Sequence, residues 1–155
     1  YGIDTMIPFD VFESLSEADT IRLAEICAGD IQPHDILLLE GDLGSGKSFF
    51  TRALIRSVLE DPSLIVPSPT FTLLQTYEGP KGPVFHYDLY RLKDPEEIFN
   101  LGWEESLAEG MVIVEWPDRL GLYRPRESLA LKFENQAGTE DARRITLTDT
   151  RSRKS

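Results

Sequence analysis

One stretch decides the fold of this chain: Glu40-Gly41-Asp42-Leu43-Gly44-Ser45-Gly46-Lys47-Ser48. Its spacing matches G-x-x-x-x-G-K-[ST], the pattern of a phosphate-binding loop. Glycines let the backbone curl until successive N–H groups point into one concavity, and a following helix directs its positive end there. An apolar run precedes the loop and an apolar helical pattern follows it. The sequence therefore predicts a strand, a phosphate-binding loop and a helix that together bind a nucleoside triphosphate.

The residues of this loop divide by their chemistry. Lys47 supplies a positive charge to the β- and γ-phosphates, and the hydroxyl of Ser48 is a possible ligand for Mg²⁺. We expect the phosphates to be held by Asp42, Leu43, Gly44, Ser45, Gly46, Lys47 and Ser48. The alternative interpretation is a glycine-rich turn that only joins a strand to a helix.

The composition fits a single domain over residues 1–155. Hydrophobic residues make up 41% of the chain and charged residues 28%, so a core can be buried without disulfides. The one cysteine, Cys27, excludes an internal disulfide framework, and its apolar neighbours predict a buried thiol. No signal peptide and no apolar run of membrane-spanning length is visible, which predicts a cytoplasmic protein.

The net charge of −11 comes from 16 basic and 27 acidic residues. Such a surface repels free nucleic acid and acidic membranes, so clamping of RNA or DNA is not expected as the main activity. The basic residues that gather late in the chain are Arg143, Arg144, Arg151, Arg153 and Lys154. We interpret them as a solvated strand followed by a frayed basic tail from about residue 149 to 155. A docking tail for RNA or an acidic partner is the alternative.

Hydrophobic periodicity and turn residues predict alternating helices and strands without repeats. We expect strands at 8–12, 35–39, 64–66, 71–77, 83–87, 111–114, 129–133 and 144–148. We expect a helix capped by Ser14 or Ser16 that stops at Gly29, and further helices at 47–59, 95–102 and 103–108. Turns at 78–82 and 136–139 predict two hairpins. The predicted fold is α/β, a P-loop NTPase-like mixed sheet with a parallel core, antiparallel flanking strands and helices on both faces.

Two carboxylates directly follow predicted strands. A P-loop enzyme needs a carboxylate at the end of a second strand to hold Mg²⁺, directly or through water. Asp88 ends the segment 84–87, and Glu115 ends the apolar run 111–114. A carboxylate placed there is uncommon without a purpose, because nothing apolar offsets its desolvation. Each could still be an ordinary surface carboxylate.

Guanine specificity is not expected, because the chain has no Asn-Lys-x-Asp element. The segment 118–121 fits Asp-x-x-Gly, but it follows Trp116-Pro117 instead of ending a strand. We interpret that match as coincidence, and adenine is the expected base.

Four segments, in this order, resemble the bacterial TsaE family, the ATPase of tRNA threonylcarbamoyladenosine biosynthesis. They are Gly41-Asp42-Leu43-Gly44-Ser45-Gly46-Lys47-Ser48, Ser68-Pro69-Thr70-Phe71, His86-Tyr87-Asp88-Leu89-Tyr90-Arg91-Leu92 and Val114-Glu115-Trp116-Pro117. The resemblance spans roughly residues 12 to 120. Ser48 stands where the family usually has Thr, and both side chains carry the hydroxyl. The C-terminal third matches no motif.

The resemblance implies a function and several roles. Members hydrolyse ATP weakly alone and act with the partner proteins TsaD and TsaB, which transfer the threonylcarbamoyl group to adenosine 37 of tRNA. Contact with tRNA is then indirect or weak, and a monomer is expected. The resemblance places Ser48 and Glu115 as Mg²⁺ ligands and Asp88 as a catalytic carboxylate at the γ-phosphate. Thr70 would belong to a switch-like loop that senses the metal or the γ-phosphate, or to an ordinary proline-rich turn.

Several assignments stay open. His86 is either a structural histidine or a phosphate contact. Tyr90 and Arg91 either pack locally or belong to a partner interface, and Trp116 is a packing or interface residue in preference to an adenine-stacking one. The segment 14–20 is expected near the adenine.

Two rival functions remain for this sequence. A small P-loop kinase would share the length and the loop, but 40 residues precede the loop here and Arg124-Pro125-Arg126 is a poor arginine-rich lid. A nucleotide-gated binding module would use ATP to set a docking surface, with little turnover of its own.

Overall fold

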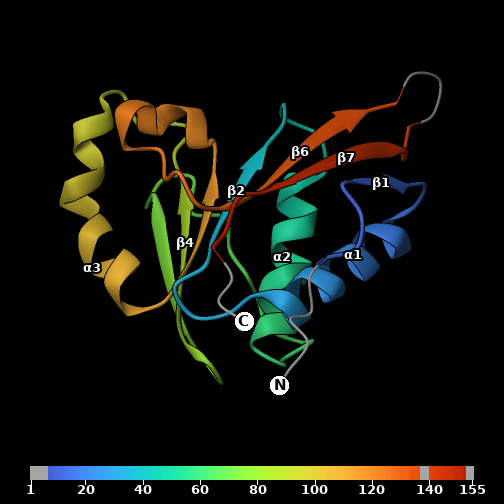
Figure 1. Cartoon of the computed structure of the whole chain (residues 1–155), viewed down its shortest axis with the longest axis horizontal. Coiled ribbons are helices and arrows are strands. Elements are labelled where there is room, and N and C mark those ends of the chain that lie inside the picture. Colours follow the sequence, from blue (N-terminus) through green and yellow to red (C-terminus); the bar gives the residue numbers. More distant parts are fainter. Residues whose placement is uncertain (1–6, 137–139, 153–155) are drawn as a thin grey trace.

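The computed structural model describes residues 7–136 and 140–152. In these residues seven strands form one sheet with the order β1-β7-β6-β2-β5-β4-β3 (Figure 1). The strands are β1 (Val11–Ser14), β2 (Ile36–Glu40), β3 (Leu74–Gly79), β4 (Gly82–Asp88), β5 (Met111–Glu115), β6 (Leu129–Asn135) and β7 (Arg143–Asp149). The central strands β6, β2, β5 and β4 run parallel, whereas β3 and β7 pair antiparallel with β4 and β6, and β1 pairs antiparallel with β7. The predicted parallel core with antiparallel flanks is confirmed.

Helices cover both faces of the sheet, as predicted. They are α1 (Glu17–Asp30), α2 (Lys47–Val58) and α3 (Trp103–Glu109), with the 3₁₀ helices η1 (Pro95–Leu101) and η2 (Pro117–Tyr123). Figure 1 shows α1 and α2 on one face and α3 on the other. Within the described ranges, no helix combines the length and the apolar character needed to cross a bilayer.

The central strands are apolar throughout because both of their faces are buried. In β2, Leu37 and Leu39 pack with the α1 and α2 side chains, whereas Leu38 packs with the cluster on the opposite face. In β5, Ile113 and Val114 divide between the two clusters in the same way. This two-sided burial explains why the strands appear in the sequence as continuous apolar runs.

The register of the parallel strands brings their carboxyl ends to one edge of the sheet. Asp88 at the end of β4 lies opposite Glu115 at the end of β5, and Glu115 in turn lies opposite Leu39 of β2. The segment between β2 and α2 starts at the same edge. The phosphate-binding loop and both strand-end carboxylates therefore meet there.

Some elements differ from the sequence-based expectations. Residues 64–66 form a loop, where Val66 is buried and Arg56 Nε donates to the carbonyl of Leu64 at 2.8 Å. The strand expected from residue 71 begins only at Leu74, because Leu73 has a positive φ of 68°. Strand β1 is shifted toward the helix that follows, and the helix η2 was not expected. The turn expected at 136–139 lies largely outside the described residues.

The end of the chain is not frayed at the positions the structure describes. Asp149 completes β7, and the Arg151 side chain is only 3% exposed. Arg151 donates to Asp30 at 2.6 Å, to Asp35 at 2.9 Å and to Asp149 at 2.7 Å. We call these four residues the Arg151 cluster. The expectation of a tail from residue 149 is therefore wrong as far as Arg151, whereas Arg153 and Lys154 lie outside the described residues.

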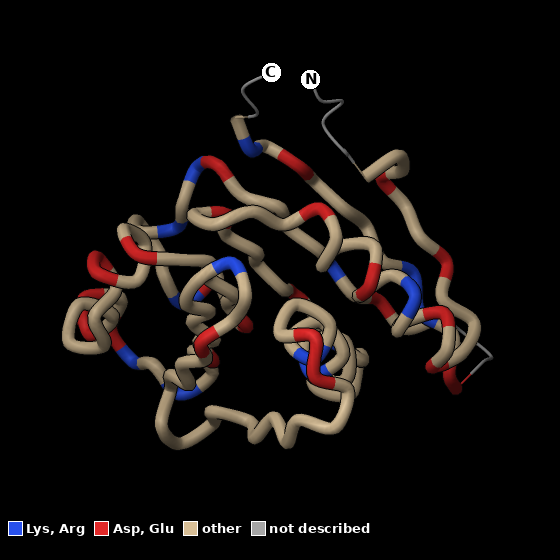
Figure 2. The backbone as a smooth tube through the Cα atoms, turned by 90° about the horizontal axis from the view of Figure 1, so that it is seen from below, with Lys and Arg blue, Asp and Glu red and all other residues tan. Residues whose placement is uncertain are grey.

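Charged residues are spread over the molecule. Figure 2 shows Asp and Glu along most parts of the backbone, with Lys and Arg interspersed between them. This distribution agrees with the net charge of −11.

Candidate functional site

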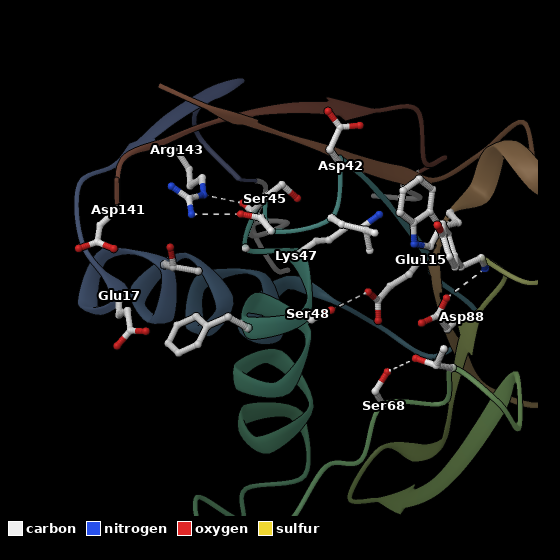
Figure 3. Close-up of a pocket in the computed structure, with 18 of the residues that line it drawn as sticks. Glu17, Asp42, Ser45, Lys47, Ser48, Ser68, Asp88, Glu115, Asp141 and Arg143 are labelled. Atoms are coloured by element: carbon white, nitrogen blue, oxygen red, sulfur yellow. Dashed lines mark hydrogen bonds between the residues drawn. The ribbon is translucent and has the colours of Figure 1, made fainter. Parts of the chain in front are cut away.

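A cavity of about 430 Å³ opens at the carboxyl ends of β2, β4 and β5 (Figure 3). Its lining contains every site residue predicted from the sequence: Asp42, Leu43, Gly44, Ser45, Gly46, Lys47, Ser48, Thr70, Asp88 and Glu115. The volume falls in the range of small-ligand sites. The structure thus brings the predicted residues together in one place, while their individual roles stay predictions.

The loop between β2 and α2 depends on its glycines. Gly41, Gly44 and Gly46 have φ angles of 151°, 79° and 96°, which L side chains rarely adopt. A Cβ on Gly41 would come within 2.6 Å of Ser45 Oγ and 2.9 Å of the Phe133 carbonyl oxygen. Gly46 is the N-cap of α2, so the unpaired N–H groups of the first helical turn open into the cavity. This backbone favours an anion.

Lys47 is a cation buried at the start of α2. Among the described residues its Nζ has no hydrogen-bond partner, and it lies 3.3 Å from the centroid of the Trp116 ring. Burial lowers the pKa of Lys47, although the nearby Glu115 and Asp88 act to raise it. A cation–π contact replaces only part of the lost hydration. Phosphate oxygens in the cavity would supply the missing acceptors.

Glu115 joins two other side chains at the end of β5. Its Oε1 accepts from Ser48 Oγ at 3.3 Å, and its Oε2 lies 2.7 Å from His86 Nε2. The side chains of His86 and Glu115 are each 3% exposed. His86 does not line the cavity, so the geometry favours its structural role: it orients the carboxylate that faces Ser48.

Asp88 lies beside Glu115 on the neighbouring strand. Its Oδ1 accepts from the backbone N–H of Tyr90 at 3.1 Å, and its own N–H donates to Leu73 at 3.0 Å. Burial raises the pKa of Asp88; the hydrogen bond from Tyr90 opposes this, and Glu115 adds to it. Two carboxylates at the ends of adjacent strands repel each other, which favours a cation or a proton between them.

The oxygen atoms at this edge suit Mg²⁺. Ser48 and Glu115 offer a hydroxyl and a carboxylate 3.3 Å apart. Within residues 7–136 and 140–152, no group of three or more His, Cys, Asp or Glu forms a complete metal site. Mg²⁺ commonly takes one or two protein ligands and completes its shell with water and substrate phosphates. The residues present therefore fit a metal that arrives with a nucleotide.

Thr70 lies on the cavity wall in the loop before β3. Its hydroxyl and that of Ser68 are 2.7 Å apart, and the loop closes through a hydrogen bond from the Leu73 N–H to the Pro69 carbonyl at 2.7 Å. The Leu73 carbonyl accepts from the N–H of Asp88. The loop that carries Thr70 is therefore connected by its backbone to a strand-end carboxylate.

Aromatic and basic side chains form the rim next to this loop. The rings of Tyr90 and Trp116 have centroids 4.9 Å apart, and the Arg91 guanidinium lies 4.5 Å from the Phe71 ring. The Phe71 side chain is 80% exposed. Tyr90, Arg91 and Trp116 all line the cavity, so these three open assignments belong to one wall of the site.

The opposite end of the cavity contains residues that the motifs did not indicate. Figure 3 shows Glu17, Asp141 and Arg143 there, away from Asp88 and Glu115. Glu17 falls within the segment 14–20 that was expected near the adenine. Arg143 was expected on a solvated strand and instead contacts the phosphate-binding loop. No local sequence signal could have identified it, since 98 positions separate it from Ser45.

The chain is similar to one known family of proteins. The family model for the threonylcarbamoyl adenosine biosynthesis protein TsaE matches residues 14–145. A tRNA threonylcarbamoyladenosine biosynthesis protein TsaE from Bacillus subtilis is 35% identical over 138 residues, 88% of this chain and 84% of that protein. The protein of the same name from Rickettsia conorii is 48% identical over 103 residues, 66% of this chain. That match spans only 58% of the Rickettsia protein's length.

A solved structure has the same architecture. The crystal structure of YdiB from Bacillus subtilis aligns with a TM-score of 0.69 and 28% sequence identity. The alignment covers 90% of this chain and 84% of that one.

Proposed function

Because this chain belongs to the TsaE family, we propose that it is the ATP-binding and ATP-hydrolysing subunit required for threonylcarbamoyl modification of tRNA adenosine 37. It acts with Mg²⁺ and with homologues of TsaD and TsaB. The relatives' names support the pathway, and the cavity supports the nucleotide. On its own the chain is expected to be a weak ATPase.

One observation carries the nucleotide assignment. The buried Lys47 Nζ has no hydrogen-bond acceptor among the described residues, and it lies at the start of a helix whose free N–H groups face the same cavity. An unpaired buried ammonium is costly unless a ligand completes it. A di- or triphosphate supplies both the negative charge and the acceptors that this arrangement lacks.

The roles of the remaining residues follow from their positions. The loop residues Asp42–Ser48 hold the phosphates, and Ser48 and Glu115 hold Mg²⁺, which neutralises phosphate charge when bound. Asp88 orients the attacking water at the γ-phosphate and accepts its proton, which suits a carboxyl whose pKa is raised by burial. Thr70 senses the metal or the γ-phosphate through its loop. The nucleoside extends toward residues 14–20.

The charge and the composition support the rest of the proposal. A chain with a net charge of −11 is poorly suited to grip tRNA, so contact with tRNA would be indirect or weak, through the partner proteins. We propose one domain over residues 1–155, a monomer when alone, and a cytoplasmic location.

The kinase alternative finds little support at this cavity. Arg124 pairs with Glu40 at 2.8 Å, and neither Arg124 nor Arg126 lines the cavity. A nucleotide-gated module with little turnover differs from our proposal only in its rate of hydrolysis. Steady-state turnover with and without the partners separates the two.

The decisive experiment titrates ATPase activity with the TsaD and TsaB homologues while tRNA modification is measured in the same reactions. We expect turnover to rise with the partners and modification to require this chain. Lys47→Ala is the inactive comparison. Modification that proceeds equally well without this chain, or with Lys47→Ala, would refute the proposal.

Base specificity is tested by competition. ATP and GTP compete for a fluorescent nucleotide analogue, and we expect ATP to displace it at a lower concentration, because no Asn-Lys-x-Asp element is present to bind guanine. Equal displacement by GTP would show that the missing element does not decide specificity.

A further inference from the structure

Arg143, the first residue of β7, reaches across the sheet edge to the phosphate-binding loop. Its Nε donates to the Ser45 carbonyl at 2.8 Å, and its Nη2 donates to the Gly44 carbonyl at 3.2 Å. The guanidinium lies against the loop, since a Cβ built on Gly46 would be 3.6 Å from Arg143 Nε. Figure 3 shows these two hydrogen bonds entering the loop from the side of β7.

The two carbonyls explain what this contact can do. Each peptide group carries its C=O and N–H in opposite directions, so fixing one end of the group fixes the other. In a loop that binds an anion, the N–H groups face the ligand and the carbonyls face away. By holding the carbonyls of Gly44 and Ser45, Arg143 restrains two peptide groups of the loop. One carries the Ser45 N–H, which donates to the Asp42 carbonyl at 3.1 Å and closes the turn, and the other carries the Gly46 N–H at the start of α2.

The other end of the guanidinium is anchored as well. Nη1 donates to the Glu140 carbonyl at 2.7 Å and to the Ala142 carbonyl at 3.0 Å. All three guanidinium nitrogens therefore donate to backbone carbonyls. The Arg143 side chain joins the phosphate-binding loop to the segment 140–142. The segment 140–142 also contributes Asp141 to the cavity lining.

This bridge requires an arginine. The planar guanidinium presents several donors in a fixed fork, whereas a lysine ammonium is a single point charge that cannot reach both segments in the same geometry. The neighbouring Arg144 forms no such bridge among the described residues: it is exposed and pairs with Glu13 on the surface.

We propose that Arg143 is a positioning residue that holds the phosphate-binding loop in its binding conformation before the nucleotide arrives. It acts through the loop backbone and not by its charge alone. The inference rests on the proposed nucleotide site for its binding readout, but the order of the empty loop can be measured without any nucleotide.

The test uses Arg143→Gln and Arg143→Lys, with Arg144→Gln as the matched control. Amide hydrogen exchange of the peptide covering residues 41–48 is measured in the nucleotide-free proteins, together with ATP affinity by calorimetry and the unfolding temperature. We expect faster exchange in this peptide for both Arg143 variants and an ATP affinity about tenfold weaker for Arg143→Gln. Arg144→Gln should match the parent in both.

The outcomes separate the possible explanations. Full recovery by Arg143→Lys would show that charge alone matters and would overturn the proposal, as would unchanged exchange and affinity in both variants. If both variants fail to fold, Arg143 is a general structural residue and the proposal is also wrong. If the parent protein binds no ATP, the proposed function fails, while the exchange measurement still decides the role of Arg143.

Discussion

Two buried cations lie at opposite ends of strand β2, and they differ in whether the described residues supply them with hydrogen-bond acceptors. At the amino end, Arg151 meets the carboxylates of Asp30, Asp35 and Asp149. At the carboxyl end, Lys47 faces Trp116, with no hydrogen-bond acceptor among the described residues. The Arg151 cation has carboxylate acceptors, whereas the Lys47 cation has none among the described residues.

This difference indicates which buried charges serve the fold and which serve a ligand. Burial acts to lower the pKa of Arg151, but its hydrogen bonds with Asp149 and Asp30 outweigh burial and raise that pKa above its ordinary value. Burial lowers the pKa of Lys47, and nearby carboxylates only partly oppose it. A cation stabilised by its own protein is a structural element, whereas one left incomplete is a candidate for binding an anion.

The largest expected effect comes from a substitution in the Arg151 cluster. Arg151→Met removes the guanidinium from the buried carboxylate of Asp30 and from the less buried Asp35 and Asp149, so we expect the free energy of unfolding to fall by about 3–5 kcal/mol. Urea unfolding followed by circular dichroism measures it. The control, Arg144→Met, removes an exposed pair with Glu13 and should cost at most about 1 kcal/mol. ATP affinity of the folded Arg151→Met protein should stay at the parent value; equal stability of the two variants would contradict the comparison.

Substitution of Lys47 should show the opposite pattern, with a large effect on ATP binding and a small effect on stability. Lys47→Ala is expected to abolish productive ATP binding and to lower turnover by about 10²–10³-fold, because the phosphates lose their counter-charge. The free energy of unfolding should change by no more than about 1 kcal/mol, since only a cation–π contact is lost. Calorimetry with ATP and urea unfolding check the two parts. Lys132→Ala, an exposed lysine of β6, is the control; ATP affinity and turnover equal to those of the parent would refute the assignment of the loop.

The two strand-end carboxylates should differ in kind. Glu115→Gln is expected to raise the Mg²⁺ concentration needed for half-maximal nucleotide binding by about ten- to a hundredfold. Asp88→Asn should leave ATP binding nearly unchanged and lower single-turnover hydrolysis by about a hundredfold, because its role is realised in the transition state.

Nucleotide titrations at several Mg²⁺ concentrations, beside single-turnover hydrolysis with the partner proteins present, separate these effects. Glu109→Gln, at the exposed end of α3, is the control. Hydrolysis by Asp88→Asn at the parent rate would make Asp88 a structural residue and leave Glu115 alone at the metal.

The smallest effect concerns the Cys27 thiol beside the Arg151 cluster. Burial, helped by the negative charge of Asp30, raises the pKa of Cys27 to about 12. At pH 8 the thiolate is therefore scarce and enclosed, and we expect Ellman's reagent to modify Cys27 only as fast as the protein opens. Arg151→Met should speed the reaction through its lower stability. A fast reaction in the stable parent protein would show that this end of the core is open.

The sequence was informative where the signal is local. The loop 41–48 and the carboxylates after two apolar runs are recognised from consecutive residues, and the structure brings them together because parallel strands end at one edge. Arg143 and Arg151 could not be interpreted in the same way. Their partners lie far along the chain, and an arginine near a chain end is usually solvated.

The errors in the predicted elements also have local physical causes. Leu73 adopts a positive φ, which no propensity predicts for a leucine, and it delays the start of β3. Residues 64–66 have the apolar character of a strand, but only Val66 is buried, and none of the strands in the described part of the chain pairs with them. Burial of a single side chain fixes a loop there instead.

The order of strands in the sheet has a consequence for the time at which the protein becomes competent during its synthesis. Strand β2 lies between β5 and β6. Ile36 pairs with Val112 of β5 and Leu37 pairs with Leu129 of β6, so β2 is paired on both sides only after both of those strands have been synthesised. The loop that follows β2 is anchored by Arg143, which is synthesised later still. We therefore expect a chain emerging from the ribosome to remain unable to hold nucleotide until Arg143 has been synthesised and has folded against the loop.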